Sequence, residues 1–328
     1  MTGAAKRRLS VALAGLAMAM SWLCAAADDY PNRPLKFIVP WPPGGTVDVR
    51  SRLIAQRLER ALQQPVVVDN RPGASGTLGM QALARAVPDG YTLAFGSFVD
   101  QAAVLSLMQS VPYDPAKDFV PIAFMGRPCY VLVANPKLGV SSVKEFVALA
   151  RSQPGQLNYA SGGIGTPHHL FMETFKHLSA IDLNHVPYKG AAPALNDVLA
   201  GHVPVMFDAS GLVAAHVQSG KLKPLLTTCA HRIDLFPEVP SASEAGYRGL
   251  DLSPWGGVFV PTGTPPAIVE RLNREINKIL AGPDIRSHIA FTGYEMENWS
   301  AQQFADFIKR DRPRWAQIIK TAGIKTDQ

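Results

Sequence analysis

Pro40-Trp41-Pro42-Pro43-Gly44-Gly45-Thr46-Val47-Asp48 is the stretch that decides the fold of this chain. It follows a strand-like apolar run at 35–39 and precedes an amphipathic, helix-like run at 48–63. Two glycines let the backbone approach a ligand closely, because no Cβ stands in the way. A helix that begins here points its free N–H groups and the positive end of its dipole at the loop. The stretch therefore predicts a strand, a glycine-rich turn and a helix N-terminus that together bind an anion.

Strand and helix patterns alternate along the chain beyond this loop. The first half continues with an apolar strand at 66–68, a helix at 77–86 and a strand at 91–95. A similar set begins near Cys129, with strands expected at 130–134, 157–160, 183–186, 203–207 and 222–228 and helices between them. Such alternation predicts an α/β fold of parallel sheets with helices on both faces.

The last part of the chain lacks a complete sheet pattern of its own. It shows a strand at 257–260, an amphipathic helix at 266–280 and a final helix that begins after Ser300. Pro313 falls inside that final helix and should kink or break it, because proline removes a backbone donor. We expect this tail to pack on the first half.

A tail that returns to the first half makes the chain cross between two lobes twice, near 126–128 and near 251–256. We therefore expect two doubly wound lobes joined by a two-crossing hinge. The first would consist of residues 28–127 and 252–328, and the second of residues 128–251. A hinge of this kind places a ligand cleft between the lobes.

The first 27 residues have the composition of a secretory signal peptide. Lys6-Arg7-Arg8 is a basic segment, residues 11–23 are apolar but too few for a comfortable membrane span, and Ala25-Ala26-Ala27 is a cleavage signal. We expect cleavage after about Ala27 and a soluble, exported protein, which in a bacterium is periplasmic.

The charge distribution argues against nucleic acid as a partner. The formal charge is +6, and without the three basic residues of the leader 29 basic and 26 acidic residues remain, which gives +3. These charges are scattered, and the densest basic run, at 309–314, is interrupted by Asp311. We interpret that run as a solvated helix face and expect no nucleic-acid partner.

Two cysteines remain after the leader, Cys129 and Cys229, each beside a strand-like run. An exported protein can join them in a disulfide, but free, buried thiols are the interpretation we favour. No spacing of Cys and His is typical of a metal site. The adjacent His168 and His169 point about 100° apart on a helix, so we expect one of them to face the cleft and neither to bind a metal.

Three glycine-rich loops, at 42–48, 72–77 and 161–169, precede helices. They either hold one anion between the lobes or only make tight turns between strands and helices, and their number favours the anion. None has the Gly-Lys-Ser/Thr ending of a phosphate-binding loop, and no cofactor is expected.

Features of an enzyme are lacking in the sequence. No nucleophile elbow of the form Gly-x-Ser-x-Gly occurs around the candidate serines, which are Ser75, Ser97, Ser161 and Ser210. We therefore expect a protein that is not an enzyme, with a periplasmic hydrolase as the alternative. Trp41 and Phe98 either wall the cleft for an organic anion or pack in the core. Asp208 either binds a ligand amine or caps the local backbone.

The quoted stretch resembles the first-loop signature of the Bug proteins, the solute-binding proteins of tripartite tricarboxylate transporters. The resemblance covers essentially the whole mature chain. It continues, in order, through residues 69–76, 111–115, 158–161, 185–190, 207–209, 238–240 and 263–265.

This resemblance implies a fold similar to type II periplasmic binding proteins, in which two α/β lobes close on a small carboxylate. Members bind mono-, di- or tricarboxylates, amino acids or aromatic acids. They deliver the ligand to a membrane permease with a large and a small subunit. For this chain the resemblance implies a monomer that serves such a permease, and a protein that docks on a membrane sensor kinase is the alternative.

In the family's pattern, one loop from each lobe holds the ligand carboxylate, and two further regions line the distal end of the cleft. Carried onto this chain and joined with the candidates above, the pattern gives the expected ligand-binding residues, which are Trp41, Gly44, Gly45, Thr46, Asp48, Ser75, Ser97, Asp100, Ser161, Gly163, Gly165, Thr166, His169 and Asp208.

The segment Ser97-Phe98-Val99-Asp100 departs from the family's pattern. If Asp100 faces the pocket, it disfavours a second negative charge there. We therefore expect a monocarboxylate or an amino acid rather than a di- or tricarboxylate.

Overall fold

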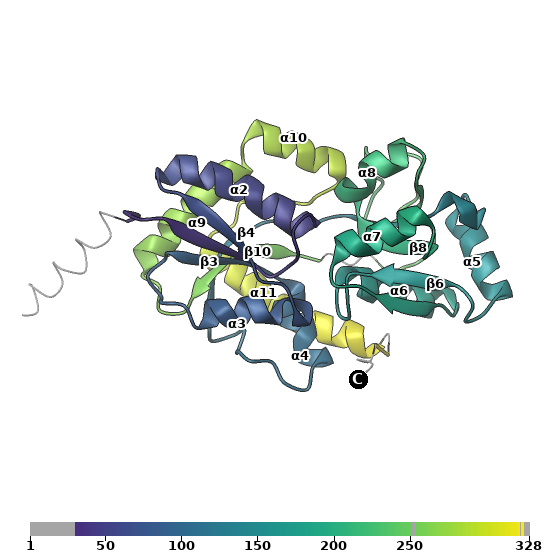
Figure 1. The fold of residues 1–328 in the computed structure, drawn as a ribbon, viewed down its shortest axis with the longest axis horizontal. Helices are drawn as coiled ribbons and strands as arrows, with labels where there is room; N and C mark the ends of the chain where they lie inside the picture. Colours follow the sequence, from purple (N-terminus) through teal and green to yellow (C-terminus); the bar gives the residue numbers. More distant parts are fainter. Residues whose placement is uncertain (1–29, 251–253, 322, 325–328) are drawn as a thin grey trace, which may run out of the picture.

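Two five-stranded sheets form the centres of two lobes that lie side by side (Figure 1). The structure is a computed structural model and describes residues 30–250, 254–321 and 323–324. The expected leader and part of the expected second crossing, residues 251–253, lie outside the described residues. This arrangement of two α/β lobes is the one expected from the sequence.

The first lobe is built on a sheet with the strand order β2-β1-β3-β10-β4. Its strands are β1 (Leu35–Val39), β2 (Val66–Asn70), β3 (Thr92–Ser97), β4 (Phe119–Phe124) and β10 (Gly256–Pro261). The second lobe is built on a sheet with the order β7-β6-β8-β5-β9. Its strands are β5 (Tyr130–Ala134), β6 (Asn158–Ser161), β7 (Asn184–Pro187), β8 (Val205–Ala209) and β9 (Lys223–Thr227).

Both sheets are mixed, so the expected parallel pairing is confirmed for part of each sheet and wrong for the pairs that involve β10 and β5. The strands β1, β2 and β3 pair in parallel, as do β6, β7 and β8, because a helix returns the chain between them. In contrast, β10 runs antiparallel to β3 and β4, and β5 runs antiparallel to β8 and β9. Both β5 and β10 enter their sheets from a crossing between the lobes rather than from a crossover helix.

Helices cover the faces of both sheets. In the first lobe they are α2 (Thr46–Leu62), α3 (Thr77–Ala84), α4 (Val104–Leu107), α9 (Pro266–Leu280), α10 (Pro283–Thr292) and α11 (Ala301–Thr321), with short helices η1 (Ala74–Gly76) and η2 (Val99–Ala103). In the second lobe they are α5 (Val143–Ser152), α6 (Pro167–Ser179), α7 (Ala191–Ala200) and α8 (Ser210–Gln218), with η3 (Pro136–Leu138).

The amphipathic patterns determine which helix faces are buried. On α2, Ile54 and Leu58 are buried in the core of the first lobe, whereas Val49 is 56% exposed. Helix α9 buries Leu272 and Ile276 in the same core. No helix in the described residues is both long and apolar enough to cross a membrane.

Helix α11 continues through Pro313, so the helix is not broken there. The proline lacks the N–H that would bond one turn back, but buried side chains on both sides of it hold the helix in place. Phe304 and Ile308 precede the proline, and Trp315 and Ile319 follow it.

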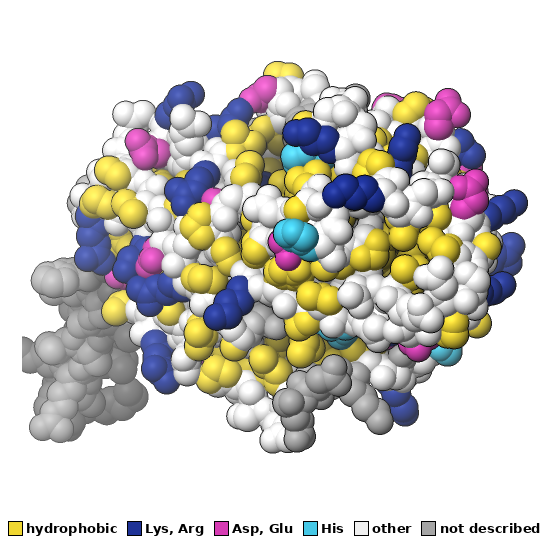
Figure 2. Space-filling view, turned by 45° about the vertical axis from the view of Figure 1, so that its right-hand side comes forward, with side chains coloured by type: hydrophobic (Ala, Val, Ile, Leu, Met, Phe, Trp, Pro, Cys, Tyr) yellow, Lys and Arg dark blue, Asp and Glu magenta, His cyan; other side chains and the backbone are white. Residues whose placement is uncertain are grey.

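The run at 309–314 is also not a wholly solvated face, because Asp311 is only 7% exposed. Its carboxylate accepts hydrogen bonds from the indole N–H groups of Trp255 at 2.6 Å and Trp315 at 2.7 Å. Elsewhere the charges are dispersed as expected. Figure 2 shows Lys and Arg side chains spread over the visible face among apolar and acidic ones.

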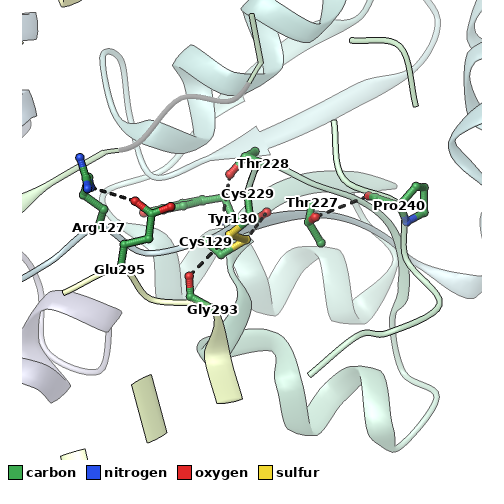
Figure 3. The surroundings of a disulfide bond; sticks show 9 residues. All are labelled: Arg127, Cys129, Tyr130, Thr227, Thr228, Cys229, Pro240, Gly293 and Glu295. Carbon is green, nitrogen blue, oxygen red and sulfur yellow. Dashed lines mark hydrogen bonds and ion pairs between the residues drawn. A yellow bond between two sulfur atoms is a disulfide. The ribbon is translucent and has the colours of Figure 1, made fainter. Parts of the chain in front are cut away.

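Cys129 and Cys229 form a disulfide, so the expectation of free thiols was wrong (Figure 3). Cys129 directly precedes β5 and Cys229 closely follows β9, and these two strands pair antiparallel. The pairing brings the two Cα atoms to 5.4 Å, although the residues are 100 positions apart in the sequence. Because the two cysteines are so far apart in the sequence, no local pattern could indicate the disulfide.

The C-terminal tail lies against the first crossing, next to this disulfide (Figure 3). Arg127 and Glu295 exchange two backbone hydrogen bonds of 2.9 Å, and their side chains form an ion pair. Gly293 packs so closely that an added Cβ would meet Ile233 at 2.2 Å and Cys129 at 3.4 Å. The tail therefore joins the first crossing and the second lobe.

Candidate functional site

A cavity lies between the two lobes. Its walls come from the starts of α2, α6 and α7, the end of β3 with η2, and the two segments that cross between the lobes. The cavity has a volume of about 100 Å³, which is room for several waters or a small organic molecule.

Three helix N-termini converge on this cavity. Thr46 and Val47 belong to the first turn of α2, His168 to that of α6, and Ala191 and Ala192 to that of α7. In the described residues none of these three helices has a side-chain cap. Their first-turn N–H groups and dipoles therefore favour negative charge in the cavity.

Aromatic side chains form much of the wall. Trp41 and Phe98, the two expected from the sequence, both line the cavity, and Phe98 also stacks on Trp315 with a centroid distance of 4.0 Å. Tyr130, Trp255 and Tyr294 were not expected and line it as well. Such walls suit the apolar body of an organic ligand.

Two buried polar atoms in lining residues have no hydrogen-bond partner in the described part of the chain. They are Trp41 Nε1 and His168 Nδ1. His168 is 6% exposed, and its Nε2 lies 3.3 Å from Asp208 Oδ1. An unpartnered buried polar group costs free energy unless a ligand or water satisfies it.

The expected site residues divide into two groups. Five line the cavity, namely Trp41, Gly45, Thr46, Ser97 and Thr166. Nine do not contribute to the lining, namely Gly44, Asp48, Ser75, Asp100, Ser161, Gly163, Gly165, His169 and Asp208. In the second group, Asp48, Asp100 and His169 make hydrogen bonds that hold the loops around the cavity.

Asp48 holds the first loop in shape. Its carboxylate accepts hydrogen bonds from the Gly44 N–H at 3.0 Å, from Asn70 at 2.8 Å and from Arg52 at 3.1 Å. Burial alone would raise the pKa of Asp48, but these hydrogen bonds hold it below its usual value. Asp48 therefore stays ionised and fixes the turn that starts α2.

Asp100 does not face the cavity, so the argument against a second negative charge loses its premise. The side chain is fully buried and accepts hydrogen bonds from the Ser97 N–H and hydroxyl and from Gln101 Nε2 at 3.0 Å. Burial raises the pKa of Asp100 to about 7, against the effect of these hydrogen bonds. The Asp100 carboxylate turns inward to accept from the Ser97 N–H. The sequence pattern could not indicate this direction of the side chain.

The second-lobe loop is held by its own hydrogen bonds. Ser161 Oγ lies 2.6 Å from His185 Nε2 and accepts from the Gly163 N–H at 3.1 Å. The Thr166 hydroxyl donates to the Gly163 carbonyl at 2.6 Å. Both hydroxyls are therefore engaged within the loop, and Thr166 also lines the cavity.

His168 is the histidine of the adjacent pair that faces the cavity. His169 lies behind the loop, where its Nδ1 accepts a hydrogen bond from the Gly165 N–H at 3.1 Å and its ring stacks on His185. Burial and the neighbouring His185 lower the pKa of His169 to about 3, so the ring is neutral at physiological pH.

Arg50 is a lining residue that the sequence analysis missed. It lies one turn after Thr46 on α2, so the four-residue spacing could have placed both on one helix face. No local sequence pattern indicated Tyr294 and Trp255 as lining residues, because they come from a part of the chain that is distant from the cleft loops in sequence. In the described residues no cluster of three or more His, Cys, Asp or Glu side chains is suited to hold a metal.

Comparison with known proteins identifies close relatives. The family model described as tripartite tricarboxylate transporter family receptor matches residues 50–324. Protein BugT of Bordetella pertussis is 39% identical over 316 residues, which cover 96% of this chain and 95% of BugT.

Solved structures agree with this match. The structure of R. palustris Rpa4515 with adipate has a TM-score of 0.87 and 33% identity, and the match covers 90% of this chain and 99% of that one. MatC (Rpa3494) from Rhodopseudomonas palustris with bound malate has a TM-score of 0.82 and 30% identity, with coverages of 88% and 100%.

Proposed function

The chain belongs to the tripartite tricarboxylate transporter receptor family, and from this premise we propose that it captures a small organic carboxylate in the cavity between its lobes. The observation that carries the proposal is the convergence of three helix N-termini without side-chain caps on one aromatic-walled cavity. A carboxylate there accepts hydrogen bonds from backbone N–H groups and lies at the positive ends of the dipoles.

The unpartnered polar atoms support the same occupant. Trp41 Nε1 is a donor that a carboxylate oxygen satisfies, and His168 Nδ1 is free to pair with a ligand or a bridging water. Relatives of known structure carry adipate and malate, both of which are carboxylates. Binding of this kind requires no covalent step.

Closure of the lobes completes the site in this proposal. The two lobes would consist of residues 28–127 with 252–328 and of residues 128–251, and they would rotate about the two crossings. Closing removes the ligand from water, where its hydrogen bonds strengthen. The closed form of the monomer would then dock on a membrane permease with a large and a small subunit.

We propose that this protein is periplasmic, on the basis of its expected leader and its family. Its basic segment, apolar segment and Ala-rich cleavage signal precede Asp28, so the mature chain would begin near that residue. An exported receptor of this family meets its ligand before the permease does.

Thermal unfolding tests the proposed function. The chain from residue 28 to 328 is unfolded and refolded to remove any carried ligand, and its melting temperature is measured with hexanoate, adipate, malate, citrate, glutamate and benzoate. The amides of the acids that lack an amine serve as uncharged controls, and the amide of glutamate keeps only its ammonium charge. An acid at 100 times its dissociation constant adds about 2.7 kcal/mol to the free energy of unfolding. If no acid raises the melting temperature above its amide, the proposal fails.

A further inference from the structure

Arg50 lies where two cavities adjoin. It lines the inner cavity between the lobes and also an outer cavity bordered by α2, α8 and α10. Thr46 and Tyr294 line both cavities too. Arg50 therefore stands at the outer end of the inner cavity, one helical turn from the N-terminus that faces the ligand.

The guanidinium of Arg50 is held in place without a carboxylate. Its Cζ lies 4.3 Å from the centroid of the Tyr294 ring, and its Nη2 lies 3.1 Å from Met296 Sδ. On the same helix, Arg52 pairs with Asp48 and Arg57 pairs with Asp284. Among the described residues, Arg50 has no such ion pair, so its charge is available to a ligand.

The inner cavity offers no compensating negative charge. None of the described residues that line it is Asp or Glu. Asp100 is turned away to Ser97, and Asp208 lies behind His168. Arg50 is a cation held over the Tyr294 ring, and three helix N-termini also favour negative charge in the cavity. The cavity is therefore suited to a ligand with more than one negative charge.

We propose that Arg50 is a specificity-determining residue that receives a second anionic group of the ligand, so that the protein prefers dicarboxylates to monocarboxylates of the same chain length. This inference rests on the proposed function, because the first carboxylate occupies the helix N-termini. The guanidinium, with its five donors in a fixed plane, binds a carboxylate through two parallel hydrogen bonds. Tyr294 supports the guanidinium from its face, and in the described residues only Nη2 has a hydrogen-bond partner, which leaves Nε and Nη1 for a ligand.

The competing interpretation gives Arg50 a structural role only. In that case the stacking on Tyr294 fixes the tail to α2, and removal of Arg50 would weaken binding of every acid equally. The two interpretations therefore differ in the ratio of the dissociation constants for mono- and dicarboxylates, not in the loss of affinity itself.

Titration calorimetry with matched ligands measures this ratio. The pairs are succinate with butyrate and adipate with hexanoate, titrated into the refolded chain 28–328. The variants are Arg50→Gln, which removes the charge, and Arg50→Lys, which keeps the charge but loses the planar fork. Arg60→Gln is the matched control, because Arg60 is on the same helix but exposed and outside both cavities.

We expect the unaltered protein to bind the better dicarboxylate about tenfold or more tightly than its monocarboxylate partner. Arg50→Gln should abolish this ratio while monocarboxylate affinity stays within about twofold, Arg50→Lys should retain part of it, and Arg60→Gln should leave it unchanged. Equal ratios in the unaltered protein and in Arg50→Gln would overturn the inference.

The result also separates this inference from the proposed function. If the unaltered protein binds monocarboxylates as tightly as dicarboxylates, the role of Arg50 is refuted while carboxylate capture stands. If no acid of either kind binds, both are refuted.

Discussion

The Ser75 hydroxyl of the first lobe donates a hydrogen bond of 2.7 Å to the Ile164 carbonyl of the second lobe. A second contact between the lobes joins two other loops, since an added Cβ on Gly190 would lie 2.9 Å from the Pro42 ring. The structure therefore has the two cleft loops closed on each other. Ser75 therefore contacts the opposite lobe through its hydroxyl.

Ser75→Gly should weaken ligand binding by destabilising the closed form. The backbone at Ser75 has φ +53°, so glycine fits there without strain while the hydrogen bond is lost. A neutral hydrogen bond contributes about 0.5–1.5 kcal/mol, which corresponds to a roughly two- to tenfold higher dissociation constant. Calorimetry measures this, and small-angle scattering should show a larger radius of gyration for the variant without ligand. An unchanged affinity would contradict a role in closure.

Asp100→Asn should change how stability depends on pH. Asp100 titrates near pH 7 in the folded protein instead of its usual 3.8, because it is buried. Between these values the folded state keeps a proton that the unfolded state releases, so the free energy of unfolding falls as pH rises from about 4 to 7. The variant lacks this dependence.

Urea unfolding of both proteins at several pH values checks this prediction. The stability of Asp100→Asn relative to the unaltered protein should rise by a few kcal/mol from pH 4 to 7 and then level off. Other titrating groups cancel in the difference. Tyr113, whose hydroxyl donates to the Asp100 backbone carbonyl, does not titrate in this range, because burial and the Asp100 charge raise its pKa further. A difference that is constant with pH would show that Asp100 titrates normally.

Asp311→Ala should destabilise the first lobe and disturb the cavity wall. Both indoles that donate to Asp311 are buried, with Trp255 2% and Trp315 1% exposed. Removing the carboxylate leaves two buried N–H groups without an acceptor, at about 1–3 kcal/mol each. Because Trp255 lines the cavity, ligand affinity should fall as well.

Denaturant unfolding followed by tryptophan fluorescence measures the effect. Asp306→Ala is the matched control, since Asp306 is an exposed residue of the same helix. Asp311→Asn retains an acceptor oxygen and should cost less than Asp311→Ala. Equal stability of Asp311→Ala and Asp306→Ala would refute the anchoring role.

The disulfide should be a major source of stability. Cys129→Ala with Cys229→Ala opens a loop of about 100 residues in the unfolded state, for which the chain-entropy argument gives up to about 4.7 kcal/mol. The melting temperature of the unaltered protein should therefore fall in reductant, and that of the double variant should not. Thiol titration of the unfolded, unreduced mature chain should find no free cysteine; two free thiols would contradict the bond.

Local patterns predicted the parts of the site that are local in sequence. Trp41, Gly45 and Thr46 lie in one strand–loop–helix unit, and the strand and helix periods around them determine where their backbone points. The same holds for Thr166 at the start of α6. These residues line the cavity because the helix begins where the loop ends.

Contacts between distant segments could not be predicted in this way. Arg50 stacks on Tyr294 from a helix 244 positions earlier in the chain, and Cys129 pairs with Cys229 across two strands. Asp100 follows a strand, as a pocket residue often does, yet its side chain turns back to the Ser97 N–H. The sequence therefore predicted the type of most elements. It could not predict the direction of individual side chains or the pairing of distant residues.

Titration of the best-stabilising acid into a variant with a filled cavity tests the central claim most directly. Ala192 lines the cavity at the start of α7, and Ala200 ends the same helix at an exposed position. Calorimetry should show 1:1 binding to the refolded chain 28–328 and to Ala200→Trp, and none to a folded Ala192→Trp. Unchanged binding to Ala192→Trp would show that the ligand does not occupy the cavity between the lobes.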